Sequence, residues 1–380
     1  MPTPWDRHLS RWQRAGLVDD ATAGRIRAFE QEHGGAASRW ARIAAALGAG
    51  LLGAGVLLFI SAHWDELSPG VRMALAVAPI VAFHALGAFA TVRGAPSLAS
   101  AAHAVGTISL GAAIALAGQI FNLAEHWPAA VLFWAVGAAA GWVLLRDWPQ
   151  AALTAVLVPA WLVGEWVVAT EDLSAPRVAH PVAAGTFLLA LAYLTARRDA
   201  DDGHVRRALG WVGGLALLPL ALLLVAISTE RGGIAPGGAL AFGWTVAMLL
   251  PLAVAVAFRG KDAWLNVVAA LWAVAVVLVS GSDGAAYRRG PGLAVYALCA
   301  LGAAGLVAWG VREQRAERIN LGLAGFTITV LGFYFSSVMD KLGRSASLVT
   351  LGALLLAGGW ALERTRRTLI AGIDPAGGAR

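Results

Sequence analysis

Seven polar or aromatic residues stand at the ends of two apolar stretches in the first third of the chain. They are His63, Trp64, Asp65, Gln119, Asn122, Glu125 and His126. Ionisable and amide groups that border apolar surroundings are costly, and such groups often bind a small ligand or ion or transfer protons. The structural alternative is that Asp65 is an ordinary solvated loop residue and that Gln119 ties two helices together.

Two histidines lie deeper within apolar stretches. His84 falls ~10 Å from one end of its predicted helix, and His103 falls ~8 Å from the same end of the next, at a rise of ~1.5 Å per residue. Adjacent antiparallel helices would place the two rings at one level, where they could relay a proton. Because no acidic third ligand occurs at that depth, we predict no metal site; hydrogen bonds to backbone or hydroxyl groups are the structural alternative.

Other candidate groups point to structure rather than catalysis. Asp340 and Arg344 have the spacing of an ion pair on one helix face, which predicts a clamp at the membrane surface. The single cysteine, Cys299, lies in an apolar stretch and excludes disulfides and cysteine-based metal sites. We assign no catalytic residue and no cofactor.

A glycine-rich pattern near the start of the chain imitates a nucleotide-binding motif. Residues 48–53 read GAGLLG, which fits GxGxxG. That motif needs a preceding strand, and here an alanine-rich helical segment leads into it. The glycines are better explained as small residues that let another helix approach closely.

Composition and patterning predict an all-α integral membrane protein. Hydrophobic residues make up 58% of the 380 residues and charged residues only 14%, against roughly 25% in soluble domains. Apolar blocks recur at the length of a membrane-spanning helix, about 20 residues. We predict twelve spans, at 43–62, 73–91, 98–120, 129–145, 151–169, 179–196, 208–228, 238–258, 263–280, 291–311, 319–338 and 346–362.

The distribution of arginine and lysine predicts the orientation. With the N-terminus inside, 22 of the 29 basic residues fall on the inner segments and 7 on the outer ones. Both termini are therefore predicted to be cytoplasmic, in the inner membrane of a bacterium, and the seven residues named first share the outer face; we call them the outer-rim residues. The basic residues are scattered through short connections and form no compact face, which argues against nucleic-acid binding.

The chain is predicted to have three parts. Residues 1–40 read as a cytoplasmic helical hairpin, with Trp5, Leu9 and Trp12 on one helix face and Asp19 or Asp20 as an N-cap for the second helix. Residues 41–363 form the bundle, and 364–380 form a basic cytoplasmic tail. The hairpin is too small for its own core, so it is expected to pack on the membrane face or on a cytoplasmic protein partner.

Several segments together resemble a known family. They are GLVDDATAGRIRAFE, LGAGLLGAGVLLFISAHWD, GTISLGAAIALAGQIFNL, RINLGLAGFTITVLGFYF and LGALLLAGGWALERTRR. This pattern is similar to the bacterial membrane-protein family known as domain of unknown function 2157. In that family an asparagine usually precedes the Trp-Asp pair, where this chain has His63. The resemblance implies a polytopic membrane protein and brings no established activity.

Three functions fit these observations. The first is a transporter-like or channel-like bundle with a polar site for a small molecule or ion at the outer rim. The second is a membrane scaffold or sensor in which residues 1–40 bind a cytoplasmic partner. The third is a membrane-embedded enzyme acting on a lipid-linked substrate through Asp65, Glu125 and His126. An enzyme is the least favoured of the three.

Overall fold

The computed structural model describes most of the chain as helix. It describes Leu9 and residues 11–33, 64–122, 126–173, 175–197, 203–228, 238–282 and 292–338, with Gly352 and Arg364. These residues divide into two compact units, Met1–Arg72 and Met73–Arg380, which are described separately. All elements in the described ranges are helical, as the composition predicts.

The first unit contains a helical turn followed by a capped helix. Residues 11–14 are helical and stop at Gly16, whose φ of 70° lies in the left-handed region that glycine adopts without strain. Helix α2 (Asp20–His33) follows. The Thr22 amide donates to the Asp19 carboxylate at 2.7 Å, so Asp19 is the predicted N-cap. This bond and a side-chain hydrogen bond with Thr22 hold the pKa of Asp19 below its usual value.

Polar side chains link the two helical segments of this unit. The Gln13 amide donates to Asp20 at 2.8 Å and accepts from Arg27 at 2.8 Å. Leu9 and Ala23 are buried. Polar contacts therefore link the two helical segments that the structure describes in this unit.

The second unit consists of long apolar helices and short connections. The helices are α4 (Pro69–Val92, which starts in the first unit), α5 (Pro96–Phe121), α6 (Trp127–Leu145), α7 (Trp148–Ala169), α8 (Ala175–Ala196), α9 (His204–Ser228), α10 (Gly238–Arg259), α11 (Trp264–Ser282), α12 (Leu293–Arg312) and α13 (Ala316–Phe333). Each of them overlaps one predicted span. A 3-10 turn, η2 (Gly260–Ala263), joins α10 to α11, and a π-helical turn, η3 (Tyr334–Val338), follows α13.

Nine stretches of the described chain are long and apolar enough to cross a membrane. One of them, Gly238–Ser280, has 43 residues. At ~1.5 Å per residue it would measure ~65 Å, about twice the hydrocarbon thickness. Gly260, with a φ of 58°, breaks it into α10 and α11. The predicted spans at 43–62 and 346–362 lie outside the described residues, so the count of twelve stays a prediction.

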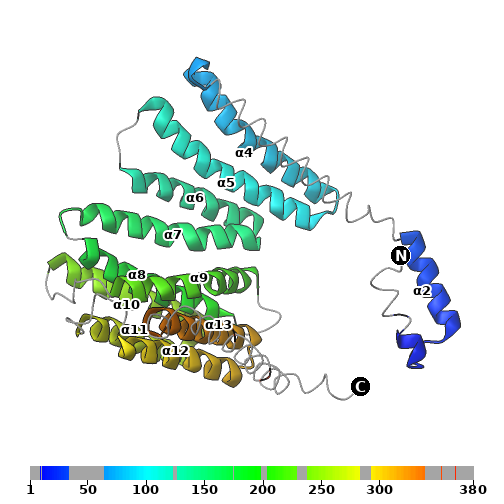
Figure 1. Ribbon diagram of the computed structural model, residues 1–380. Coiled ribbons are helices and arrows are strands. Elements are labelled where there is room, and N and C mark those ends of the chain that lie inside the picture. The colour runs from blue at the N-terminus through cyan, green and yellow to red at the C-terminus, as the bar shows by residue number, and fades with distance from the viewer. Residues whose placement is uncertain are drawn as a thin grey trace. The chain divides into compact units, whose positions relative to one another are not determined.

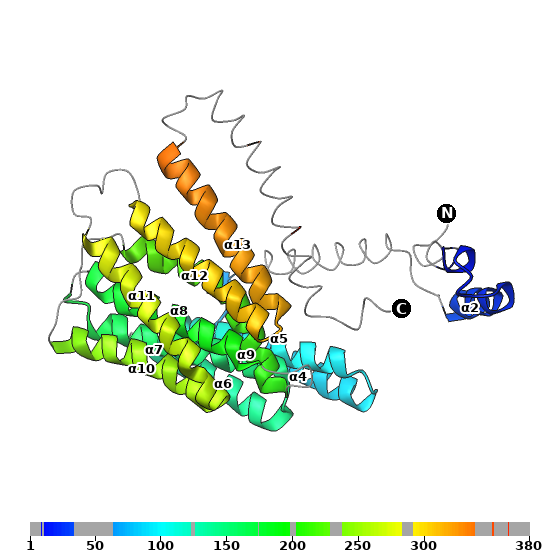
Figure 2. The ribbon, with the colours of Figure 1, turned by 90° about the horizontal axis from the view of Figure 1, so that it is seen from below.

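Helix α8 is the most enclosed helix of the second unit. In its apolar window 72% of the residues are buried, against 17–39% in the other candidate spans. It packs against α9 and α10 (Figures 1 and 2). Gly213 of α9 permits the closest approach, because a Cβ atom there would lie less than 3.0 Å from the backbone of Ala190 and Leu194. The small residue lets the two backbones touch, as in membrane helix pairs generally.

Other helices pair with their neighbours in sequence. Helix α6 packs against α7 and α5, and α12 packs against α13. Figure 1 shows α5, α6 and α7 following one another, and Figure 2 shows α12 beside α13. Sequential antiparallel packing is what short connections enforce.

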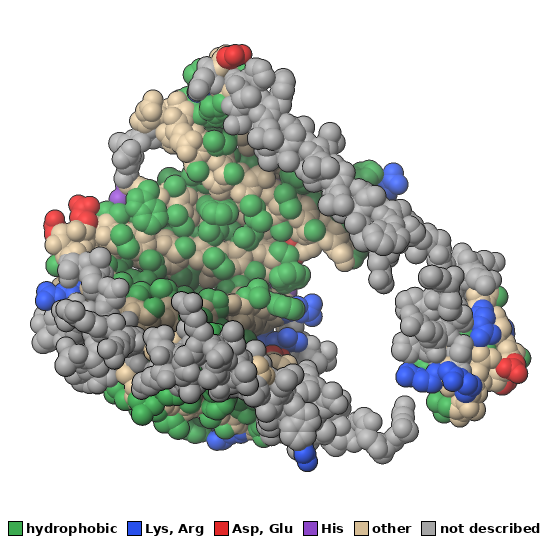
Figure 3. All heavy atoms as spheres, viewed as in Figure 1, with side chains coloured by type: hydrophobic (Ala, Val, Ile, Leu, Met, Phe, Trp, Pro, Cys, Tyr) green, Lys and Arg blue, Asp and Glu red, His purple; other side chains and the backbone are tan. Residues whose placement is uncertain are grey.

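The outer surface of these helices is strongly apolar. Figure 3 shows hydrophobic side chains over the face formed by α5, α6 and α7, with charged side chains toward its edges. Large side chains on this surface are mostly solvent-accessible, for example Phe133 (64%) and Leu144 (81%). Trp127 and Trp148 begin α6 and α7, where amphipathic rings meet a membrane interface. The helices therefore contact the lipid bilayer.

Candidate functional site

The two deep histidines are in direct contact. Nδ1 of His84 on α4 lies 3.0 Å from Nδ1 of His103 on α5, and the ring centroids are 5.3 Å apart. His84 is eight residues from the end of α4, ~12 Å, and His103 is seven residues from the start of α5, ~10 Å. The antiparallel arrangement thus brings the rings to one level, deep in the apolar part of both helices.

Each histidine ring occupies the space left by a glycine on the other helix. A Cβ atom on Gly87 would lie 2.6 Å from the His103 ring, and one on Gly106 would lie 2.8 Å from the His84 ring. Gly87 follows His84 by three residues, and Gly106 follows His103 by three residues. The two helices therefore present the same His-x-x-Gly pattern to each other. These glycines therefore make room for the rings.

The geometry of this pair suits a shared proton. An Nδ1–Nδ1 contact requires one ring to donate and the other to accept, so the two neutral rings must be different tautomers. A single added proton can be held between the two nitrogens, whereas two added protons would repel each other. Among the described residues no three His, Cys, Asp or Glu side chains gather as a metal site would need. The pair can therefore hold or pass one proton.

The outer-rim residues fall in different parts of the structure. His63 and Glu125 lie outside the described residues. Trp64 and Asp65 belong to a 3-10 turn, η1 (Trp64–Glu66), in the first unit. The guanidinium of Arg72 lies 5.5 Å from the centroid of the Trp64 ring. The Asp65 side chain is not described.

The remaining outer-rim residues follow α5. Gln119 is exposed on the last turn of that helix, and Asn122 is its exposed C-cap, with a φ of 46°. The backbone N–H of Asn122 donates to the carbonyl of Gly118, and this bond ends the helix. His126 is the residue before α6. Whether these groups form one site with the first unit stays a prediction.

His126 pairs with a carboxylate from the next helix. Its Nε2 lies 2.9 and 3.1 Å from the two oxygens of Glu165 on α7. The indole of Trp161, one turn before, donates to Glu165 at 2.8 Å. His126 and Glu165 are 52% and 37% exposed, so this pair lies at the surface of the protein. It joins α6 to α7 at the end opposite the histidine pair.

The predicted clamp of Asp340 and Arg344 lies outside the described residues. The tail from 339 onward is described only at Gly352 and Arg364. The clamp therefore stays a prediction.

Arginine-containing connections gather at the other end of the helices, which we call the arginine-rich end. It contains the links α4–α5, α6–α7, α8–α9, α10–α11 and α12–α13. Hydrogen bonds join several of these links. The Ser100 hydroxyl donates to Asp147 at 3.0 Å, and the Trp142 indole donates to His204 at 3.1 Å.

Three arginines cap the C-terminal end of α8. The last carbonyls of a helix have no partner within the helix and carry partial negative charge, so cations are favoured there. Each arginine comes from a different helix and donates to a different carbonyl. The pairs are Arg259 with Thr195 (2.8 Å), Arg206 with Ala196 (2.7 Å) and Arg318 with Arg197 (3.1 Å).

Glu313, between α12 and α13, neutralises two of these arginines. Arg259 donates to its carboxylate at 2.6 Å, and Arg318 forms a second short ion pair with it. The Trp309 indole donates to the same carboxylate at 2.6 Å, and its ring lies 5.3 Å from the Arg259 guanidinium and 5.6 Å from that of Arg318. Both arginines are almost fully buried, and Glu313 is 24% exposed. We call these four residues the Glu313 cluster.

The Glu313 carboxylate is strongly stabilised in its charged form. Burial by itself raises the pKa of Glu313. The hydrogen bonds from Arg259, Arg318 and Trp309 and the charge of Arg318 outweigh burial and lower the pKa from 4.5 to about 2. The cluster is therefore ionised at neutral pH, and it fixes the ends of α8, α10, α12 and α13 together.

Sequence reasoning missed the Glu313 cluster. It treated Arg259 and Arg318 only as basic residues of connections. A weak signal was present, because Trp309 and Glu313 are four residues apart and lie on one helix face. The partners on α8 and α10 are distant in sequence, and no local pattern indicates them.

The helices and their apolar surfaces define a polytopic α-helical membrane protein. Residues 10–151 match the model of a family described as predicted membrane protein (DUF2157). The family resemblance noted in the sequence is thereby confirmed for residues 10–151, a range that includes His84, His103 and His126. No curated protein and no solved structure matches the chain.

Proposed function

We propose that this membrane protein is a proton-linked, transporter-like helix bundle in which His84 and His103 exchange a proton. The observation that carries the proposal is the 3.0 Å Nδ1–Nδ1 contact within two apolar helices. Histidine is the side chain whose unperturbed pKa lies closest to neutral pH, so it can load and release a proton under ordinary conditions. Titratable groups within membrane-spanning helices commonly belong to proton-transfer or ion pathways.

A proton path through the whole bundle would need a second titratable group that can accept and release the proton. The pair of His126 and Glu165 is titratable and exposed at the opposite end. His103 and the end of α5 at Phe121 are 18 residues apart, which is ~27 Å along the helix. A proton crosses that interval only if helices move or water enters between them. We therefore propose a transporter-like conformational change rather than a permanent channel.

Proton flux through liposomes tests this proposal. The full chain would be reconstituted in vesicles containing a pH-sensitive dye, and a pH step would be applied outside. We expect flux that falls at least tenfold in His84→Gln and in His103→Gln. Ser109→Ala is a matched control, because its hydroxyl bonds only within α5, to Val105 at 2.9 Å. A wild-type rate equal to that of protein-free vesicles would refute the proposal.

We further propose that the arginine-rich end and both termini face the cytoplasm of a bacterial cell. The support is the positive-inside tendency of short connections. A protease-sensitive tag on either terminus should be cut in inverted membrane vesicles and protected in intact spheroplasts. The reverse pattern would overturn this orientation.

A second candidate is a scaffold or sensor that binds a cytoplasmic protein through residues 1–40. The observation that favours it is the apolar exposure of the small first unit, where Leu17 is 75%, Phe29 57% and Trp12 42% exposed. Copurification with the full chain and with a Leu17→Ser, Phe29→Ser double variant tests this role. A partner that the double variant retains equally well would exclude these side chains as the contact.

A further inference from the structure

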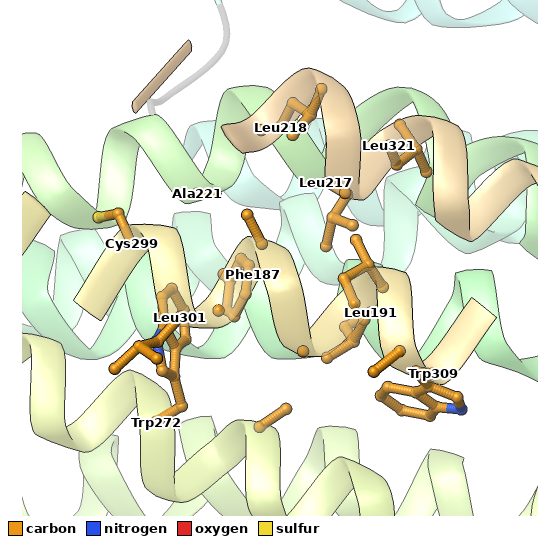
Figure 4. Close-up of a pocket in the computed structure, with 18 of the residues that line it drawn as sticks. Phe187, Leu191, Leu217, Leu218, Ala221, Trp272, Cys299, Leu301, Trp309 and Leu321 are labelled. Carbon is orange, nitrogen blue, oxygen red and sulfur yellow. The ribbon is translucent and has the colours of Figure 1, made fainter. Parts of the chain in front are cut away.

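A cavity of about 490 Å³ lies between five helices of the second unit. Its walls come from α8, α9, α11, α12 and α13, and Figure 4 shows side chains of these helices around it. Its volume is within the range of sites that hold small molecules, roughly 300–1,000 Å³. Leu222 and Leu301 line it and are 52% and 66% exposed, so the cavity opens to the surface of the bundle.

Small residues on α12 and α13 create this space. Gly305 lies in the wall, and a Cβ atom added there would meet nothing within 4 Å. Three residues earlier, Gly302 is covered by the Trp272 ring, which would be 2.6 Å from a Cβ atom. Gly325 of α13 faces the same cavity. Of these glycines, Gly305 is the one at which an added side chain would enter open space.

The wall is almost entirely apolar along its length. The indole nitrogen of Trp272 is turned away and donates to the carbonyl of Leu298 at 2.8 Å. Cys299 and Thr329 are weakly polar, and the Thr329 hydroxyl is bonded to Gly325 within its own helix at 2.8 Å. Such a wall offers hydrocarbon contact and little hydrogen bonding, so it suits an apolar chain.

One end of the cavity carries a cation. Arg312, the last residue of α12, lies in the wall, and its guanidinium is 5.3 Å from the centroid of the Trp264 ring at the start of α11. Among the described residues no carboxylate pairs with Arg312, because the neighbouring Glu313 is held by Arg259 and Arg318. The charge is therefore free to meet an anion at the arginine-rich end.

The length of the cavity agrees with a membrane lipid. Cys299 and Arg312 both line it and are 13 residues apart on α12, which is ~20 Å. One leaflet of a ~30 Å hydrocarbon core is ~15 Å thick. A lipid with its headgroup at Arg312 would place an acyl chain along the wall as far as Cys299. Basic sites between membrane helices bind anionic headgroups in this way.

We propose that this cavity binds one acyl chain of an anionic phospholipid, with the headgroup phosphate paired to Arg312. The site lies among α8 to α13 and shares no residue with the histidine pair. A test of lipid binding at this site is therefore independent of whether His84 and His103 transfer a proton. Because Trp309 lines the cavity and also donates to Glu313, the lipid would contact the Glu313 cluster directly.

The single cysteine makes the proposal testable in the full chain. The delipidated protein in detergent would be treated with a small membrane-permeant maleimide, and modification of Cys299 would be followed by mass spectrometry. We expect phosphatidylglycerol to slow labelling at least fivefold, and phosphatidylcholine with the same chains to slow it much less. Native mass spectrometry of the same samples should show one tightly retained phosphatidylglycerol.

Two variants separate the chain contact from the headgroup contact. Gly305→Phe fills open space, so it should slow labelling without lipid and abolish the retained phosphatidylglycerol. Gly118→Phe on α5 is its control, because that position is also open. Arg312→Gln should weaken phosphatidylglycerol about fivefold and phosphatidylcholine much less, because the choline cation of that lipid offsets the charge of its phosphate. Arg93→Gln is its control, since Arg93 similarly lies over an aromatic ring, that of Phe89, at 4.8 Å.

Three results would overturn the proposal. The first is equal protection by the two lipids with no effect of Arg312→Gln. The second is phosphatidylglycerol retained in Gly305→Phe. The third is a Cys299 that never reacts in denaturant-free detergent but reacts after residues 339–380 are removed, which would mean that this segment of the chain fills the cavity.

Discussion

Nδ1 of His84 lies 3.0 Å from Nδ1 of His103, and each ring fills the space left by a glycine three residues after the other histidine. The contact therefore depends on four residues, two that meet and two that make room. Removing either glycine should disturb the pair while leaving both imidazoles in the chain. This relationship allows the geometry of the pair to be tested separately from its chemistry.

Gly87→Ala should separate the histidines. The new Cβ atom would lie 2.6 Å from the His103 ring, so the ring must move. Overpacking of this kind costs about 1–3 kcal/mol, and we expect proton flux in liposomes to fall with it. Gly118→Ala on α5 is the control, because its added methyl meets open space and alanine favours helix. Unchanged flux in Gly87→Ala would show that the close contact is dispensable.

Glu313→Gln should destabilise the protein strongly. The substitution leaves Arg259 and Arg318 buried close together without their common counter-charge, and breaking such a pair costs about 3–5 kcal/mol. The measurement is thermal unfolding in detergent, followed by circular dichroism. Glu171→Gln, at an exposed site beyond α7, is the control and should be nearly neutral. A loss no larger than that of the control would mean that the cluster contributes little to stability.

The Glu313 cluster also predicts a pH dependence. The pKa of Glu313 is about 2 in the folded protein and 4.5 in its ordinary state. A lowered folded-state pKa contributes stability that is fully present above pH 4.5 and is lost as the pH falls toward 2, up to about 3 kcal/mol in total. Midpoints of unfolding measured between pH 6 and 2.5 should fall less steeply in Glu313→Gln than in the wild type. Parallel curves would contradict this assignment.

Neighbouring glycines on α9 should respond very differently to the same substitution. A methyl group at Gly213 would lie less than 3.0 Å from backbone atoms of Ala190 and Leu194. These atoms are part of helix α8, so they cannot move aside as a flexible side chain could. At Gly214 the nearest atom would be the Leu194 Cδ1, 3.8 Å away. We therefore expect Gly213→Ala to lower the melting temperature by several degrees, and Gly214→Ala to preserve or raise it. Equal effects would argue against close backbone contact between α8 and α9.

Local patterns predicted the helices well. Apolar blocks of span length identified α4 to α13, because a membrane demands a long apolar stretch whose backbone groups bond within the segment. The same patterns predicted that His84 and His103 lie at one level, since adjacent helices with a short connection must be antiparallel. Asp19, one of the two predicted N-caps, precedes the first residue of α2 and caps that helix.

Long-range packing could not be predicted in the same way. Arg259 and Glu313 are 54 residues apart, and the carbonyl of Arg197 is 121 residues from Arg318. The predicted spans left all of these residues in connections, where charges are usually solvated, whereas Arg259 is the last residue of α10 and Arg318 lies in the first turn of α13. The structure buries the two arginines because α8, α10, α12 and α13 end at the same place. Neither the partners nor the burial has a local signature.

The sequence by itself determined that this is a polytopic helical membrane protein, because hydrophobic length and the distribution of charge are properties of the chain read in order. Only the tertiary structure decided which polar groups meet. It brought a glycine opposite each histidine, gathered three arginines on the last turn of α8, and left a cavity ending at Arg312. These contacts depend on the rotation of each helix about its axis and on its choice of neighbour. In a chain with apolar residues on every face, the pattern of residues leaves both open.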